Sequence, residues 1–239
     1  MIWNMEKFIS KLNKLNVDHN NNRYTLGKAP HKPVLLLSLA LLYKNEKVDL
    51  DNIKPDLYLR DTWESLWECL DYKKVGPIHL PMYHMRSDGF WEIDLKEGMS
   101  PHQPRSLNEL VDMSSRIHLR QEIIQYFGTE EERNEIMNTI LNGGYFSDPE
   151  IKRLRQYISN FDSFFEYEEK LNTILKQEFR MNLDQDDMME SRRDPAFRRM
   201  VLEAYDERCS VCELKLVTSS GISVIDSAHI LPLLTFQER

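Results

Sequence analysis

The side chains best placed to bind an anion come at the start of an apolar stretch. His31 and Lys32 precede Pro33, and residues 33–43 are apolar on almost every side of a helix. A helix of that composition is buried. The free amides and the dipole at its N-terminus favour a negative group such as a phosphate. The sequence therefore predicts an anion site at His31 and Lys32, although a histidine that only caps its helix would leave the same pattern.

A second set of chemically active residues lies near the C-terminus. Cys209 and Cys212 have the spacing of half a zinc site, but tetrahedral zinc takes four ligands and no second pair follows them. We therefore expect two small buried thiols, with a half zinc site as the alternative. His229 ends a β-prone run, and Asp226 is the nearest carboxylate. Histidine titrates near neutral pH and can act as a general base, although a lone histidine at a strand end is also common.

The elements that must position these residues are mostly helices. Apolar residues recur at spacings of three and four through much of the chain, which is the helical period. The stretch from Gly76 contains prolines and a Ser-Asp-Gly turn, and it predicts a turn-rich entry to a short strand at 90–95. We therefore expect a mainly α fold with a short β element. The expected helices are 3–15, 33–43, 57–70, 107–113, 117–127, 129–142, 150–181 and 195–205.

The C-terminal stretch resembles the opening of an HNH endonuclease, the ββα-metal nuclease family. The matching residues are Phe197-Arg198, Tyr205, Cys209 and the block Asp226-Ser-Ala-His229-Ile-Leu-Pro232. The resemblance implies that His229 is the general base, with Mg²⁺ or another divalent metal as cofactor, and Asp226 is a candidate metal ligand. The family also has an Asn and a second His on a following helix, and neither residue type follows His229. We therefore expect a partial module that does not cleave DNA by itself.

The N-terminal half resembles the sulfur-binding domain that recognises phosphorothioate DNA. Two blocks carry the resemblance, Pro30-His-Lys-Pro-Val-Leu-Leu-Leu37 and Leu80-Pro-Met-Tyr-His-Met-Arg-Ser-Asp-Gly-Phe-Trp91. In type IV, modification-dependent restriction endonucleases this domain commonly precedes an HNH module, which is the order found here. The resemblance implies a shallow apolar cup for the sulfur, with cationic residues around it that hold phosphates.

Pro81 matches the proline of that cup, while Leu80 and His84 stand where the family often has other residues. His31 and Lys32 match the cationic residues at the helix start, and Arg86 and Arg105 are candidates for phosphate or base-edge contacts. The implied DNA and sulfur site thus comprises His31, Lys32, Leu80, Pro81, Tyr83, His84, Arg86 and Arg105. Alternatives are that Pro81 ends a strand and that Arg86 pairs locally with Asp88.

Sulfur in place of a non-bridging oxygen is larger and less strongly hydrated. Contact with an apolar surface therefore costs the sulfur less hydration free energy than it costs an oxygen. Discrimination of about 1–3 kcal/mol is reasonable for such a contact.

The charge distribution does not argue against a DNA partner. The formal net charge is −8, but the acidic excess lies in residues 129–190, with 15 Asp and Glu against 7 Lys and Arg. The segments on either side are balanced, so either can present a basic face. Three cysteines suit a reducing compartment, and no apolar run is long enough to span a membrane. We expect a cytoplasmic protein with no membrane partner.

These observations predict three segments. Residues 1–128 form the sulfur-binding domain, 129–193 an acidic helical linker that serves as a spacer or dimerises, and 194–239 the first part of an HNH domain. The expected function is recognition of phosphorothioate-modified double-stranded DNA as the reader of a restriction endonuclease. One alternative is a DNA-binding protein without catalysis. Another is an HNH nuclease that reads a different modification or unmodified DNA.

Overall fold

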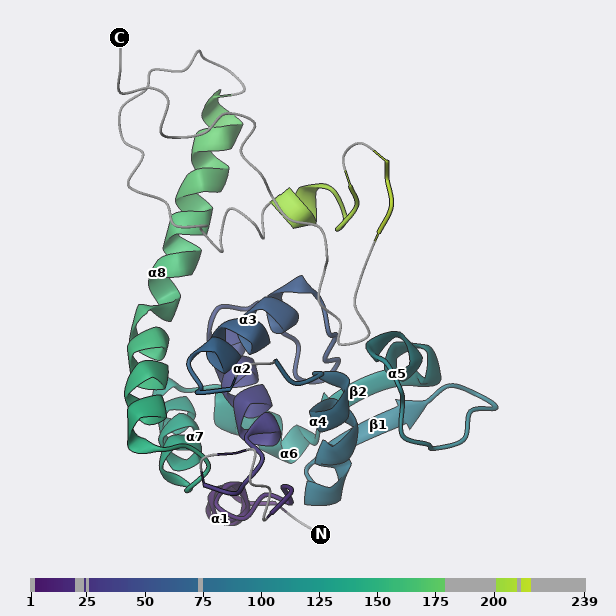
Figure 1. Ribbon diagram of the computed structural model, residues 1–239, viewed down its shortest axis with the longest axis vertical. Coiled ribbons are helices and arrows are strands. Elements are labelled where there is room, and N and C mark those ends of the chain that lie inside the picture. The colour runs from purple at the N-terminus through teal and green to yellow at the C-terminus, as the bar shows by residue number, and fades with distance from the viewer. Residues whose placement is uncertain are drawn as a thin grey trace. The chain divides into compact units, whose positions relative to one another are not determined.

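The fold is mainly helical, as the sequence predicted, with one two-stranded antiparallel sheet in the part of the chain that is described (Figure 1). The computed structural model describes residues 3–19, 24, 26–72, 75–178, 201–209 and 212–215. The elements in chain order are α1 Met5–Leu12, α2 His31–Lys44, α3 Leu57–Glu68, α4 His79–His84, η1 Met85–Asp88, β1 Trp91–Leu95, α5 Leu107–Met113, β2 Ser114–Leu119, α6 Gln121–Ile124, η2 Gln125–Phe127, α7 Glu130–Asn142 and α8 Asp148–Glu178.

Helix α2 forms the centre of the core. Every residue from Lys32 to Leu42 is buried, which confirms the prediction of a helix enclosed on all sides. It packs against α3, α4 and α7. Pro33 suits the first turn of the helix because the missing N–H of proline would have no partner there. The core therefore fixes the N-terminus of α2, and with it His31 and Lys32.

An aromatic cluster joins the first helix to the sheet. Asn4 caps α1 by accepting a hydrogen bond from the Lys7 amide at 2.9 Å. The ring of Phe8 lies 5.1 Å from that of Phe90, and the ring of Trp3 lies 5.9 Å from Phe90, both edge-to-face. Such pairs add stability beyond the apolar area that they bury. They hold α1 beside the turn that precedes β1.

Two local predictions were wrong. Residues 114–119, expected in part to begin a helix over 117–127, form β2, in which Ile117 lies opposite Ile93 of β1. Pairing with a distant strand overrides the helical spacing here, and the helical part shrinks to α6 and η2. Residues 79–84, expected to be turn-rich, form α4. Pro81 lies in the first turns of that short helix, where proline is tolerated.

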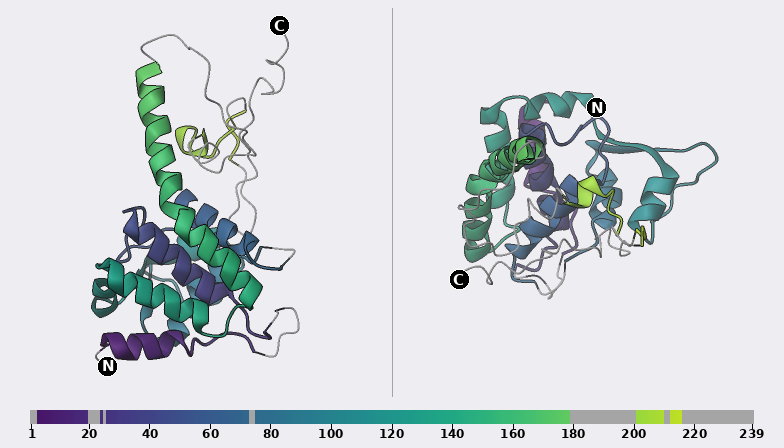
Figure 2. Two further views of the ribbon diagram at one scale, coloured as in Figure 1. Left: turned by 90° about the vertical axis from the view of Figure 1, so that its left-hand side faces the viewer. Right: turned by 90° about the horizontal axis from the view of Figure 1, so that it is seen from above.

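The chain divides into two compact units, with the division inside α8 after Asp162. The first unit includes residues 129–162, which the sequence assigned to the linker. Ile136, Ile140 and Leu141 of α7 are buried, and α7 lies between α1 and α2 (Figure 2). The acidic segment thus has an apolar face that belongs to this core.

In the second unit the structure describes the end of α8, a helical stretch at 201–204 and the short segment around Cys209. Arg208 and Lys215 form an isolated antiparallel bridge. Most of the segment that resembles an HNH nuclease, including Asp226 and His229, lies outside the described residues. Among the described helices, none has a stretch long and apolar enough to cross a bilayer.

Candidate functional site

A pocket of about 520 Å³ lies in the first unit where α2 begins and α4 passes. We call it the α2–α4 pocket. It brings together five of the predicted site residues, which are His31, Lys32, Leu80, Pro81 and His84. The other lining residues are Ser87 and a group from the segment before α2, namely Asn16, Val17, Asp18, Tyr24 and Ala29.

The apolar wall of the α2–α4 pocket comes from α4. Pro81 is buried and Leu80 is half-buried. Helix α4 packs against α2, so both side chains stand beside the N-terminus of the core helix. Although Pro81 is buried, it lines the same pocket as His31.

His31 lies in an aromatic niche at the start of α2. Its ring centroid is 4.8 Å from that of Trp67 and 5.6 Å from that of Tyr24. Burial lowers the pKa of His31 to about 4, against a weaker opposing effect of Asp18. The imidazole is therefore neutral at pH 7 and offers ring nitrogens rather than a charge.

Gly76 lets the chain pass close to that histidine. A Cβ at this position would lie 2.5 Å from Nε2 of His31, closer than any side chain could approach without displacement. The Gly76 carbonyl also accepts a hydrogen bond from Nε1 of Trp63 at 3.1 Å. Sequence reasoning did not connect Gly76 with the site, because the two residues are 45 positions apart.

Lys32 is tied to a buried carboxylate. Its Nζ lies 2.6 Å from Oδ2 of Asp88 and donates to Oγ of Ser87 at 3.0 Å. The other carboxylate oxygen of Asp88 pairs with Nζ of Lys11 at 2.9 Å and accepts from the Asn16 amide at 2.8 Å. Burial lowers the pKa of Lys32, while the Asp88 carboxylate acts to raise it.

Two lysines thus share one carboxylate, so the cluster of Lys11, Lys32 and Asp88 holds one surplus positive charge when both lysines are protonated. The Asp88 side chain is fully buried. Arg86 does not make the local ion pair with Asp88 that the sequence allowed, since two lysines occupy both carboxylate oxygens. The sequence placed Asp88 in the motif but did not show its partners.

His84 completes the site on the exposed side of α4. Partial burial lowers its pKa, and the positive charges of Lys32 and Arg86 lower it further. The ring is therefore uncharged at pH 7. Tyr83, the next residue, is buried, and its ring centroid is 5.3 Å from that of His84.

Tyr83, Arg86 and Arg105 are not among the described residues that line the pocket. The Arg86 guanidinium lies 3.8 Å from the centroid of the Tyr83 ring, and its Nε donates to the Tyr83 carbonyl at 3.1 Å. Arg105 is exposed before α5, and its backbone amide donates to Glu109. Both arginines thus lie outside the pocket lining, Arg86 half-buried against Tyr83 and Arg105 exposed.

The cysteine pair lies in the second unit. Cys209 and Cys212 are free thiols, the first half-buried and the second exposed, so the interpretation as two buried thiols was wrong. The Cys209 amide donates to the Leu214 carbonyl at 3.0 Å, and the Glu213 amide donates to the Cys209 carbonyl at 2.9 Å. Within the described residues, no group of three or more His, Cys, Asp or Glu side chains is arranged to hold a metal ion. The predicted candidates Asp226 and His229 fall outside those residues.

Comparison with known proteins adds no assignment to this geometry. No model of a known protein family matches the chain, and no curated protein matches it.

Proposed function

We propose that the first unit binds double-stranded DNA and recognises a phosphorothioate linkage in the α2–α4 pocket. One observation carries the proposal: Leu80 and Pro81 share a pocket with Lys32 and with the N-terminus of a buried helix. A phosphorothioate is anionic and has one weakly hydrated sulfur. A pocket with an apolar wall beside a cationic helix start suits both properties.

The apolar wall provides the discrimination. An ordinary phosphate oxygen placed against Leu80 and Pro81 would lose hydrogen bonds to water and gain none, whereas sulfur loses less. A preference of about 1–3 kcal/mol corresponds to roughly 5- to 150-fold in affinity.

The positive charge of the site comes from lysine and the helix terminus rather than from histidine. The cluster of Lys11, Lys32 and Asp88 carries one surplus charge when both lysines are protonated. The dipole of α2 adds to this charge, and the Asp18 carboxylate in the pocket lining opposes it. His31 and His84 are neutral at pH 7 because their pKa values are lowered. They serve as hydrogen-bonding walls, and the half-buried Arg86 and the exposed Arg105 are candidates for contacts to backbone phosphates or base edges.

The test compares one duplex with and without a single phosphorothioate, at one salt concentration because phosphate contacts dominate affinity. We expect tighter binding of the modified duplex. Leu80→Asn should reduce the preference to less than about twofold, because the amide returns a polar partner to the oxygen. Leu214→Asn is the matched control, since Leu214 is exposed in the second unit. Equal affinity of the wild-type protein for both duplexes would end the proposal.

We further propose that this reader serves a nuclease, with His229 as general base and a divalent metal as cofactor. The support is the resemblance of Phe197-Arg198, Tyr205, Cys209 and the block from Asp226 to Pro232 to the opening of an HNH module. Incubation of the modified duplex with Mg²⁺ tests it. Because no Asn or second His follows His229, we expect this chain alone to bind the modified duplex without cleaving it. Cleavage that appears when a segment with those residues is added, and that is lost in His229→Ala, supports a nuclease. Absence of cleavage even with that segment supports the alternative of a non-catalytic reader.

A further inference from the structure

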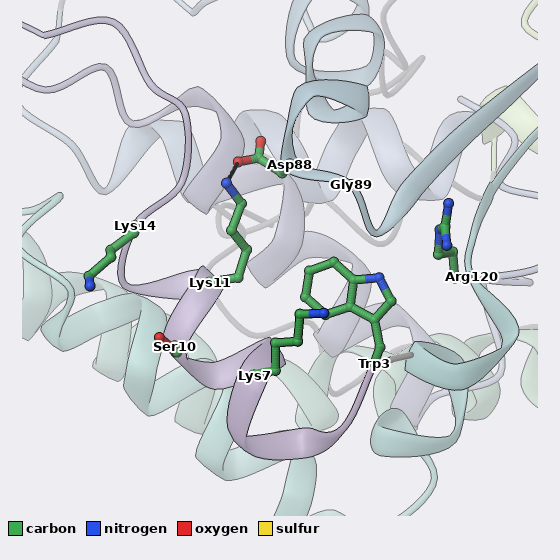
Figure 3. A pocket seen from close by; sticks show the side chains of 8 residues that line it. All are labelled: Trp3, Lys7, Ser10, Lys11, Lys14, Asp88, Gly89 and Arg120. Carbon is green, nitrogen blue, oxygen red and sulfur yellow. Dashed lines mark ion pairs between the residues drawn. The ribbon is translucent and has the colours of Figure 1, made fainter. Parts of the chain in front are cut away.

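A second pocket, of about 610 Å³, lies on the other side of Asp88 between α1 and the turn that leads into β1 (Figure 3). We call it the α1 pocket. Its lining includes three lysines of α1 or its C-terminal end, the ring of Trp3, and Arg120 after β2. The residues on which the argument depends are Trp3, Lys7, Lys11, Lys14, Asp88 and Arg120.

The lysines share one face because their spacing is helical. Lys7, Lys11 and Lys14 are separated by four and three positions, which brings side chains to the same side of a helix. Lys7 lies over the Trp3 ring, with Nζ 4.8 Å from the ring centroid. Lys14 is exposed. One wall of the pocket is thus positively charged along its length.

Two buried donors in this pocket have no acceptor. Within the described part of the chain, neither Nε1 of Trp3 nor Nε of Arg120 has a hydrogen-bond partner. Only 6% of the Trp3 surface is exposed. Indole and guanidinium nitrogens can only donate hydrogen bonds, and a buried donor without an acceptor is costly. In Figure 3 the indole nitrogen is on the side of the ring nearer Arg120.

The carboxylate in the lining does not cancel this charge. Asp88 is the one acidic residue among the described residues that line the pocket. Its oxygens already accept from Lys11, Lys32 and the Asn16 amide. Arg120 has a partner outside the lining, with Nη2 2.7 Å from Oε1 of Glu92. What the pocket still lacks is an acceptor that carries negative charge.

We propose that the α1 pocket binds a phosphate group, held by the Trp3 indole, Arg120 Nε and the α1 lysines. Phosphate has several acceptor oxygens and a charge that suits lysine and arginine. The group can come from a free phosphate or from the backbone of a DNA duplex. The DNA source rests on the proposed function, in which a duplex binds at the α2–α4 pocket on the other side of Asp88.

The first arm uses inorganic phosphate and the full chain, with chloride balancing the ionic strength. The indole N–H signal of Trp3, assigned from Trp3→Phe, should shift saturably in a nitrogen–proton NMR spectrum. Trp91 is the internal control, because its Nε1 is also buried without a partner but does not line the pocket. Lys7→Gln should weaken the apparent affinity about fivefold, because Lys7 lies over the Trp3 ring. Lys152→Gln, which changes an exposed lysine of α8, should leave the affinity unchanged.

The second arm uses an unmodified duplex. Lys14→Gln should lower affinity and reduce the slope of log affinity against log salt by about 0.9, the value for one lost phosphate contact. It should act equally on a phosphorothioate duplex, so the sulfur preference stays as in the wild type.

The outcomes separate this site from the sulfur site. A Trp3 shift with phosphate but no Lys14 effect on DNA supports a phosphate site and refutes its use for the DNA backbone. A second outcome is that the protein prefers the phosphorothioate duplex, the Trp3 signal does not shift with phosphate, and Lys14→Gln does not change DNA affinity. This outcome overturns the α1 site while the proposed function stands. A Trp3 shift together with equal affinity for both duplexes supports the α1 site while the sulfur hypothesis fails.

Discussion

Asp88→Asn should destabilise the first unit strongly, because it removes the negative charge that two lysines share. Lys32 is 5% exposed and Asp88 is 4% exposed, so both groups of that pair are out of water. Removing one partner of such a pair leaves an uncompensated buried charge and costs about 3–5 kcal/mol. The asparagine can still accept from the Asn16 amide, so the loss is mainly that of the charge. Asp94→Asn is the matched control, since the Arg116–Asp94 pair is largely exposed and is worth about 0–1 kcal/mol.

The destabilisation by Asp88→Asn should depend on pH, and the pKa of Lys32 gives the direction. Burial lowers the pKa of Lys32, so the folded chain binds fewer protons than the unfolded chain near that pKa, and stability rises with pH there. Asp88 opposes the lowering, and without it Lys32 releases its proton more readily. The stability deficit of Asp88→Asn should therefore shrink as the pH rises from 7 toward 10.5, the ordinary lysine pKa.

Urea unfolding, followed by far-UV circular dichroism at several pH values, measures both effects. The two variants and the wild type should have the same dependence on urea concentration if unfolding stays cooperative. A deficit below about 1 kcal/mol at pH 7, or one that grows with pH, would refute the view that Asp88 neutralises a buried lysine.

Two further predictions concern the niche around His31. Stability should fall by up to about 3 kcal/mol as the pH drops from 6.5 toward 4, because folding favours the neutral ring of His31. His31→Asn should lose this part of the pH dependence in denaturation curves, whereas substitution of the exposed His102 should keep it. Gly76→Ala should cost about 1–3 kcal/mol, since its Cβ would meet His31 at 2.5 Å and Trp67 at 3.2 Å. Thermal unfolding measures that cost, and an unchanged melting temperature would show that the niche adapts.

The elements that the sequence predicted well are those whose signal is local. Helix α2 follows from an almost continuous apolar run. The expected helix at 129–142 matches α7, which Thr129 caps by accepting a hydrogen bond from the Glu132 amide. Strand β2 was missed because its conformation depends on pairing with β1, about 25 residues earlier. Helix α4 was missed because prolines suggested turns, whereas packing against α2 stabilises a short helix.

The same distinction applies to the candidate site. The motif residues His31, Lys32 and Pro81 could be identified, and the structure places them around one pocket. The role of Asp88 could not, because its partners Lys11 and Lys32 come from two other helices. The neutral state of His31 also depends on aromatic rings from α3, which no local pattern reveals.

A carboxylate held between two lysines makes the two pockets energetically dependent on each other. When an anion in the α1 pocket attracts Lys11, Asp88 interacts more strongly with Lys32. The positive potential in the α2–α4 pocket then falls. By thermodynamic reciprocity, a ligand that engages Lys32 must change affinity in the α1 pocket by the same factor. We therefore expect the two halves of this surface to show negative cooperativity toward small anions, even though no backbone movement is needed to connect them.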